Sequence, residues 1–161
     1  INRMWKYDML TQVLNRSGFF YCAETILQKI KEEKSNAFII FLDIDGLKSV
    51  NDNLGHEIGD AFIAKIAGIL KEVVPKDCLI MRYGGDEFVV FGSCKQAGRM
   101  QRIAEDIKAA IKTADQKENR SYHLAASLGC SLHKSYEMDN LNSLIELADK
   151  KMYEEKKNKR R

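Results

Sequence analysis

The sequence predicts an α/β (α+β) fold in which helices cover a single mixed sheet. A continuous apolar run at 36–45 is typical of a buried central strand. Two further apolar runs, at 78–83 and 87–92, are joined by a Gly-Gly pair that favours a hairpin turn, because glycine reaches positive φ without a side-chain clash. Apolar residues recur at helical spacing around these runs. Strands and helices therefore alternate around one hairpin, without an internal repeat.

The remaining elements follow the same kind of pattern in chain order. Helices are predicted where apolar residues repeat with a helical period, at 18–34, 61–75, 96–116 and 139–160. The segment 46–60 contains Gly, Asn and Asp and is predicted to form a short helix followed by a loop. A last strand is predicted at 122–133, and Asp139 or Asn140 is a suitable N-cap for the final helix.

Composition narrows the class of protein. The 161 residues suffice for one ordinary domain, and 45% hydrophobic with 30% charged residues allow a packed core. The net charge is only +3, and the terminal "EEKKNKRR" carries much of the excess, so we expect no nucleic-acid partner. The four cysteines lack a C-x-x-C pair, which favours reduced thiols and a cytoplasmic setting. No apolar run approaches the roughly 20 residues that span a bilayer, so we expect no membrane contact by this domain.

Acidic residues stand at two of the predicted strand ends. Asp43 and Asp45 close the first strand, and Asp86 and Glu87 follow the Gly-Gly pair. Ionised carboxylates at the end of a buried strand are costly unless they are paired or bound to a metal. If the first strand lies beside the hairpin, these acids converge at one edge of the sheet, where Mg²⁺ could bind them together with substrate phosphates. Solvated acids at strand ends are the alternative interpretation, and spacing alone does not decide between the two.

The polar segment after the first strand offers groups that suit a nucleotide. Asn51 and Asp60 can together match the guanine edge, because a carboxylate accepts hydrogen bonds from guanine N1–H and the 2-amino group. Lys48 can bind a phosphate. His56 is interpreted as a structural hydrogen-bonding residue, since nothing near it resembles a nucleophile triad.

Two stretches, "RYGGDEFVV" at 82–90 and "FLDIDGLKSVNDNLGHEIGD" at 41–60, together resemble the GGDEF family of diguanylate cyclases. "YDMLTQVLNR", "SLG" at 127–129 and "ADKKMYEEKK" resemble further family motifs, in the family's order. The resemblance implies a five-stranded sheet wrapped by helices and related to the polymerase palm and the nucleotide cyclase fold. It also implies an enzyme, a nucleotidyltransferase that condenses two GTP molecules into cyclic di-GMP and releases pyrophosphate. Mg²⁺ or Mn²⁺ is the implied cofactor.

The same resemblance implies roles for individual residues. The metal site would consist of Asp43, the Ile44 carbonyl, Asp86 and Glu87. Asp86 and Glu87 would be catalytic, with Asp86 as the general base for the ribose 3′-hydroxyl. Substrate contacts are implied for Asn51, Asp60 and His56 at the guanine, for Gly46, Leu47 and Lys48 at the triphosphate, for Gly84 and Gly85 by close backbone approach, and for Lys156 and Arg160 at the terminal phosphates.

The implied organisation involves more than this chain. Each attacking 3′-hydroxyl would come from the nucleotide of the facing subunit, so catalysis would need a head-to-tail homodimer with two-fold symmetry. Residues 1–17 would form the end of an upstream linker and the N-terminal family motif, and 18–161 the GGDEF catalytic domain. An upstream sensory domain would regulate it. The full-length protein would be cytoplasmic, with or without a membrane anchor.

Two departures from the family pattern bear on function. In the last motif, Glu155 stands where Ala is usual and Lys159 where Gly is usual, which leaves the role of Arg160 open. "PKDC" at 75–78 replaces an R-x-x-D product-inhibition site, so we expect no inhibition by product there. The alternative function is a catalytically weak GGDEF module that binds GTP or acts as a dimerisation or signalling partner. Retention of the acids favours activity.

Overall fold

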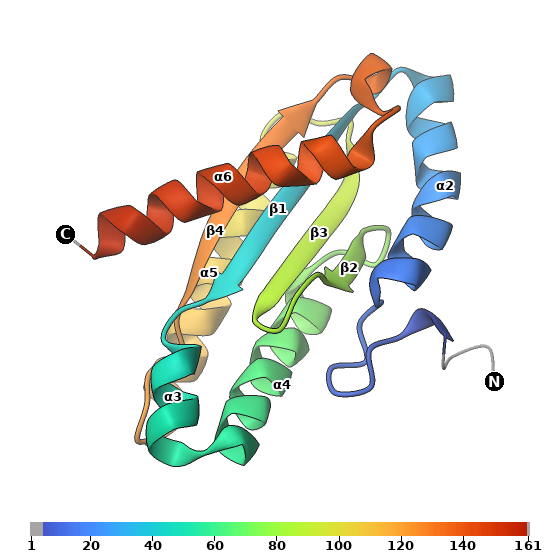
Figure 1. Ribbon diagram of the computed structural model, residues 1–161. Helices are drawn as coiled ribbons and strands as arrows, with labels where there is room; N and C mark the ends of the chain where they lie inside the picture. The colour runs from blue at the N-terminus through green and yellow to red at the C-terminus, as the bar shows by residue number, and fades with distance from the viewer. Residues whose placement is uncertain (1–4, 161) are drawn as a thin grey trace.

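The computed structural model describes residues 5–160, and its centre is a sheet of four strands in the order β2-β3-β1-β4 (Figure 1). β1 (Asn36–Ile44) lies between β3 (Glu87–Cys94) and β4 (Ala126–His133), and β2 (Leu79–Arg82) lies outside β3. All three strand pairings are antiparallel. The predicted class, α/β (α+β) with one sheet wrapped by helices, is confirmed.

β1 is the middle strand because nearly all of its side chains are apolar and can be buried on both faces of the sheet. Successive side chains of a strand point to opposite faces. Phe38, Ile40 and Leu42 therefore pack in one core, whereas Ile39 and Phe41 pack in a second core. The chain has two apolar layers, one on each side of the sheet.

Two pairs of helices cover these layers, as Figure 1 shows. α4 (His56–Val73) and α5 (Arg99–Lys117) close the first core, and α2 (Arg16–Glu33) and α6 (Leu141–Lys159) close the second. A short 3₁₀ helix, η1 (Ser135–Glu137), leads from β4 into α6. α6 crosses the face of the sheet, so its last turns can reach the acidic end of β1.

The sheet has four strands rather than the five that the resemblance implied, and within residues 5–160 no pair of strands is parallel. The parallel component is a single bridge between Leu14 and Met81. The backbone N–H of Leu14 donates to the Ile80 carbonyl at 3.0 Å, and that of Arg82 donates to the Leu14 carbonyl at 2.9 Å. The bridge does not extend into a strand because α2 begins at Arg16.

The segment predicted as a short helix and a loop consists of two helices. α3 (Leu47–Leu54) is followed after one residue by α4, which begins at His56 rather than at residue 61. Gly55 alone turns the chain, with φ 91° and ψ 162°. A side chain disfavours that backbone region, so glycine allows a corner of one residue. Asp60 consequently lies on a helix.

The start of β4 differs from the prediction, and the N-cap of α6 is one of the two residues predicted for it. β4 begins at Ala126 rather than at residue 122, because α5 holds the preceding loop: Asp115 Oδ1 accepts a hydrogen bond from the Leu124 N–H at 2.8 Å. Of the two predicted N-caps of α6, Asn140 is the cap. The Asp139 carboxylate instead forms an ion pair with a lysine of α2.

Candidate active site

The end of β1 and the Gly-Gly hairpin lie side by side. Asp43 is opposite Glu87 in the antiparallel register, and the backbone N–H of Ile44 donates a hydrogen bond to the carbonyl of Asp86 at 2.9 Å. The hairpin thus brings the acids of two distant segments to one end of the sheet. We call the side chains of Asp43, Asp86 and Glu87 the carboxylate corner.

Asp43 carries its charge in an unfavourable environment. Burial and the nearby charge of Asp86 raise the pKa of Asp43 to about 6, although Lys156 opposes the shift with its ammonium group 3.0 Å from Asp43 Oδ2. The other oxygen, Oδ1, is buried and has no hydrogen-bond partner among the described residues. Buried polar atoms without a partner are rare in folded proteins. This oxygen is therefore available to a cation.

Glu87 and the two glycines fit together at the hairpin. Burial and the charges of Asp86 and Asp149 raise the pKa of Glu87. A Cβ atom at Gly84 would collide with Glu87 Oε1, whereas a Cβ atom at Gly85 would meet open space. Neither glycine has a positive φ, so the prediction that positive φ forms this turn is wrong. A side chain at Gly84 would therefore force the carboxylate end of Glu87 to move.

α6 places two lysines at this end of the sheet. Lys156 Nζ lies 3.3 Å from the Ile44 carbonyl oxygen, in addition to its contact with Asp43. Lys159 Nζ lies 2.9 Å from Asp45 Oδ2. Lys156 thus lies at the corner, while its role at the terminal phosphates stays a prediction, and Lys159 had no predicted role.

The predicted triphosphate residues surround the start of α3. Gly46 joins β1 to α3 with φ 78°, and the buried Leu47 anchors the first turn of the helix. The side chain of Lys48 is 93% exposed, and it lies 3.7 Å from the Asp52 carboxylate. The first N–H groups of a helix have no partner within the helix and favour anions. The start of α3 can therefore accept phosphates directly beside the end of β1.

The predicted guanine residues meet where α3 joins α4. Asn51 packs so tightly against α4 that a Cβ atom at Gly59 would collide with Asn51 Oδ1. Asp60 follows Gly59 and is exposed, as is His56 at the start of the same helix. The structure therefore gathers these side chains at one helix–helix corner.

Arg160 is not joined to the carboxylate corner by any contact. It is the C-cap residue of α6 and is exposed. Within the part of the chain that the structure describes, no hydrogen bond or ion pair involves its guanidinium group. Of the two predicted terminal-phosphate residues, the structure places only Lys156 beside the acids.

A second cluster, which we call the N-terminal clamp, holds the hairpin and had no predicted role. Arg82 Nη1 lies 3.2 Å from both carboxylate oxygens of Asp8, and Arg82 Nη2 donates to the Gly85 carbonyl at 2.8 Å. Arg16 Nε donates to the Tyr83 carbonyl at 2.8 Å, and its guanidinium carbon lies 4.0 Å from the centre of the Tyr83 ring. The only sequence signal was that Asp8 and Arg16 belong to the "YDMLTQVLNR" motif.

The corner fits a divalent cation bound together with a substrate. Residues 5–160 contain no cluster of three or more His, Cys, Asp or Glu side chains arranged as metal ligands. Mg²⁺, however, usually takes only one or two carboxylates where substrate phosphates complete its coordination. Asp43 and Asp86 supply two carboxylates, Ile44 supplies a carbonyl, and Asp43 Oδ1 has no hydrogen-bond partner within residues 5–160.

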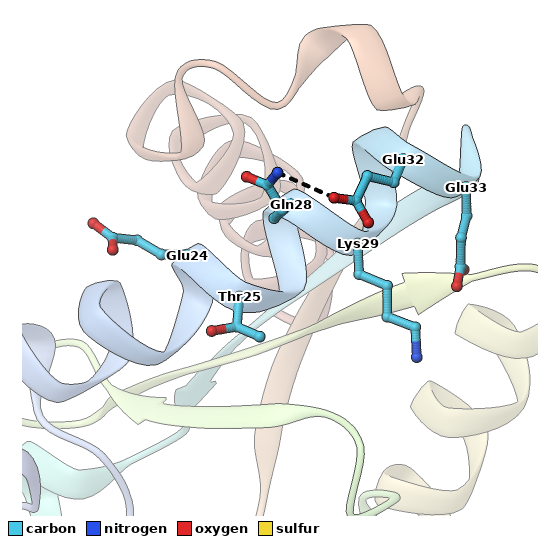
Figure 2. Close-up of a pocket in the computed structure, with 6 residues that line it drawn as sticks. All are labelled: Glu24, Thr25, Gln28, Lys29, Glu32 and Glu33. Carbon is cyan, nitrogen blue, oxygen red and sulfur yellow. Dashed lines mark hydrogen bonds between the residues drawn. The ribbon is translucent and has the colours of Figure 1, made fainter.

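A separate hollow of about 580 Å³ lies on the outer side of α2 (Figure 2) and is lined by Glu24, Thr25, Gln28, Lys29, Glu32 and Glu33. Gln28 Nε2 donates to Glu32 Oε1, one turn further along α2, at 3.1 Å. Three glutamates and one lysine make this surface acidic, and it lies towards the end of α2 away from Arg16, which contacts the hairpin. We assign it no function.

The middle strand of this antiparallel sheet ends in acids beside an acidic hairpin, and a helix N-terminus and two lysines lie close by. Carboxylates can hold a divalent cation and a helix N-terminus can hold a phosphate, so the site has the groups that would bind a nucleotide together with a divalent cation. The chain belongs to the GGDEF family, because the family described as "Diguanylate cyclase, GGDEF domain" matches residues 5–161.

Similar proteins include two that are named diguanylate cyclases. Diguanylate cyclase A of Treponema denticola is 29% identical over 95% of this chain and 42% of its own length. Diguanylate cyclase VdcA of Vibrio cholerae is 32% identical over 93% of this chain and 44% of its own length. An uncharacterized membrane protein of Staphylococcus epidermidis is 34% identical over 74% of this chain and 32% of its own length. The chain thus spans less than half the length of these relatives.

Solved structures agree with this assignment. The coiled coil and GGDEF domain of DgcB from Caulobacter crescentus, in complex with c-di-GMP, has a TM-score of 0.85 at 25% identity, over 98% of this chain and 83% of that one. The GGDEF domain of YfiN from Pseudomonas aeruginosa has a TM-score of 0.82 at 28% identity, over 94% and 89%. Within the described residues, no helix is long and apolar enough to cross a membrane.

Proposed function

We propose that this chain is the catalytic domain of a diguanylate cyclase, which condenses two molecules of GTP into cyclic di-GMP and releases two of pyrophosphate. The observation that carries the proposal is the carboxylate corner, where Asp43 and Asp86 meet and the buried Asp43 Oδ1 has no partner in the part of the chain that the structure describes. The names of two relatives and the c-di-GMP in the DgcB structure support it.

Mg²⁺ or Mn²⁺ would be held by the carboxylates of Asp43 and Asp86 and the carbonyl of Ile44, with Glu87 beside them. Such a cation neutralises the phosphates and polarises the reacting phosphoryl group. When the cation neutralises the charge on Asp43, the Lys156 side chain would exchange its contact with Asp43 for one with the terminal phosphates.

The nucleotide would lie between the corner and α3. The first N–H groups of α3, at Gly46 and Leu47, and the side chain of Lys48 would bind the triphosphate. Asn51 and Asp60 would hydrogen-bond the guanine edge. A carboxylate at Asp60 selects guanine over adenine, because it would face the adenine N1 acceptor without a proton between them.

In the reaction, the 3′-oxygen of one GTP forms a bond to the α-phosphorus of the other, and the bond from that phosphorus to the pyrophosphate oxygen breaks. Asp86 would accept the proton of the 3′-hydroxyl. Catalysis of this kind is mostly positioning and charge neutralisation. Because each site holds one GTP, two subunits must face each other head to tail around a two-fold axis.

The test is to incubate the protein with GTP and Mg²⁺ and measure cyclic di-GMP at several protein concentrations. The rate should rise with the square of protein concentration while dimers are scarce. Asp86→Ala should abolish product, whereas Asp106→Ala, an exposed acid of α5, should leave the rate unchanged. GTP binding without product at concentrations where a dimer is seen by ultracentrifugation would instead support a binding or signalling module.

We further propose that the domain acts in the cytoplasm and is regulated by an upstream sensory domain. Residues 1–17 would then be the end of an upstream linker and the N-terminal family motif, which supplies Asp8 and Arg16 to the N-terminal clamp; residues 1–4 lie outside the described residues. Comparing the rate of this chain with that of the full-length protein, with and without its signal, tests this regulation.

A further inference from the structure

Two charged residues in the last turns of α6, Glu155 and Lys159, contact the outer edge of β4. Glu155 Oε1 accepts a hydrogen bond from the backbone N–H of Leu128 at 3.3 Å, and Lys159 Nζ donates to the Ala126 carbonyl at 2.6 Å. Glu155 Oε1 also lies 3.8 Å from Lys159 Nζ. These contacts fix the direction of the Lys159 side chain, which therefore extends back towards the end of β1.

Lys159 and Lys156 share one carboxylate. Asp45 Oδ2 lies 2.9 Å from Lys159 Nζ, and Asp45 Oδ1 lies 3.7 Å from Lys156 Nζ. The buried Ser127 donates its hydroxyl to Asp45 Oδ1 at 2.8 Å, which holds the carboxylate in place. Two ammonium groups on neighbouring turns of one helix repel each other. Asp45 keeps them together beside the carboxylate corner.

The charge balance of the proposed site calls for a second cation on the protein. Four carboxylates, those of Asp43, Asp45, Asp86 and Glu87, gather at this end of the sheet, where a triphosphate would bring further negative charge. Lys156 already contacts two of them. Lys159 adds a cation whose side chain is 44% exposed, compared with 17% for Lys156, so it can reach a ligand without leaving the surface.

There is also open space beside Lys159, lined by more lysines than acids. A cavity of about 350 Å³ between α5, β4 and α6 is lined by the lysines Lys108, Lys112 and Lys159 and by the acids Asp115 and Glu155, on an apolar floor that includes Leu124 and Leu128. Arg160, by contrast, has no contact with this region in the described part of the chain.

We propose that Lys159 is a second phosphate-binding residue of the nucleotide site and acts with Lys156 on the terminal phosphates, in the place that the resemblance implied for Arg160. The inference rests on the proposed function, because it assumes that GTP binds with its phosphates beside the carboxylate corner. Binding exchanges the contact of Lys159 with Asp45 for one with a phosphate oxygen.

The test compares the affinities for GTP and GMP in Mg²⁺, measured by calorimetry with the wild type and single variants. Lys159→Gln removes the charge and keeps a polar side chain. A charge-assisted hydrogen bond to a terminal phosphate should make its loss weaken GTP binding about tenfold. GMP binding should be unchanged, and Lys159→Arg should restore most of the affinity for GTP.

Lys157→Gln is the matched control, since Lys157 lies in the same last turn and contacts Glu154 and the Tyr153 ring instead. It and Arg160→Gln should both bind GTP as the wild type does. An unchanged GTP affinity in Lys159→Gln, an equal loss for GMP, or a larger loss in Arg160→Gln would overturn the inference while GTP binding by the wild type still supports the proposed function. A wild type that does not bind GTP would overturn both.

Discussion

Asp8 and Asp43 lie near the same hairpin, but their carboxylates are satisfied to different degrees. Burial alone would raise the pKa of Asp8, but hydrogen bonds from Thr11 and the Arg82 guanidinium hold it below its ordinary value of 3.8. Burial and Asp86 instead raise the pKa of Asp43 to about 6. The folded protein therefore favours the ionised form of Asp8 and disfavours the ionised form of Asp43.

The difference separates a structural acid from a candidate functional one. Each oxygen of Asp8 has a donor within the protein, and Oδ2 has both the N–H and the hydroxyl of Thr11, at 2.9 and 2.7 Å. Asp43 Oδ1 has none among the described residues. A chain that retains a buried, unpartnered oxygen loses stability unless a ligand supplies the missing interaction. The N-terminal clamp fixes the position of the hairpin, and the hairpin in turn places Asp86 and Glu87 in the carboxylate corner.

The largest expected effect is that of Asp43→Asn, with opposite signs for activity and stability. Cyclase activity should fall by about a thousandfold or more, because a cation ligand is lost. In EDTA at pH 8, the free energy of unfolding should rise by about 1–2 kcal/mol, because the repulsion from Asp86 and the cost of burying the charge disappear. Urea unfolding measures the second quantity. A less stable variant would show that the ion pair with Lys156 contributes more to stability than the repulsion from Asp86 and the burial of the charge cost.

Asp8→Asn should lower the free energy of unfolding by about 1–3 kcal/mol at pH 7, because Arg82 keeps a half-buried charge without its partner. Since folding lowers the pKa of Asp8, its contribution is complete above the ordinary value of 3.8 and is lost as pH falls through the folded-state value. Urea unfolding at neutral and acidic pH should therefore show the two proteins converging at low pH. A constant difference would assign the effect to packing instead.

The two glycines offer a smaller, matched comparison. Gly84→Ala places a Cβ atom against Glu87 Oε1 and should lower both activity and the free energy of unfolding, the latter by about 1 kcal/mol. Gly85→Ala meets open space and should be close to neutral for stability. Equal effects of the two substitutions would argue against the close fit of Glu87 at the corner.

The last prediction is that added cyclic di-GMP has no inhibitory effect through residues 75–78. Pro75 and Cys78 cannot supply the guanidinium and carboxylate of an R-x-x-D site, Cys78 is buried, and the Asp77 carboxylate is engaged by Arg99 at 2.6 Å. Added cyclic di-GMP should therefore not inhibit the enzyme from this surface. A titration of the initial rate tests this, and tight noncompetitive inhibition would contradict it.

Sequence predicted best what depends on short stretches. The apolar run of β1, the hairpin and most helices could be predicted from local patterns. The convergence of Asp43 and Asp86 followed from placing the first strand beside the hairpin. The corner at Gly55 was missed because a single residue with an unusual φ leaves no distinct pattern in composition. A fifth strand was expected from the resemblance alone, and at the outer edge of β2 the described residues form only an isolated bridge between Leu14 and Met81.

The contacts that sequence could not predict join distant residues. Asp8 and Arg82 are separated by 74 positions, and Asp45 and Lys159 by 114. Nothing in either short stretch identifies its partner, since exposed acids and lysines are common on any surface. Lys159 stood out as a departure from the family pattern, but only the packing of α6 across β4 shows where its ammonium group lies.

The most direct measurement is the affinity of the site for Mn²⁺, determined by electron paramagnetic resonance. The titration is made in the presence of the non-hydrolysable analogue guanosine 5′-[α,β-methylene]triphosphate. It should be made with the wild type, Asp43→Asn, Asp86→Asn and the double variant. If one ion touches both carboxylates, each single substitution should weaken binding about tenfold or more, and the double variant should be little worse than either. Losses that simply add, or a single variant that binds Mn²⁺ as the wild type does, would contradict a shared cation site.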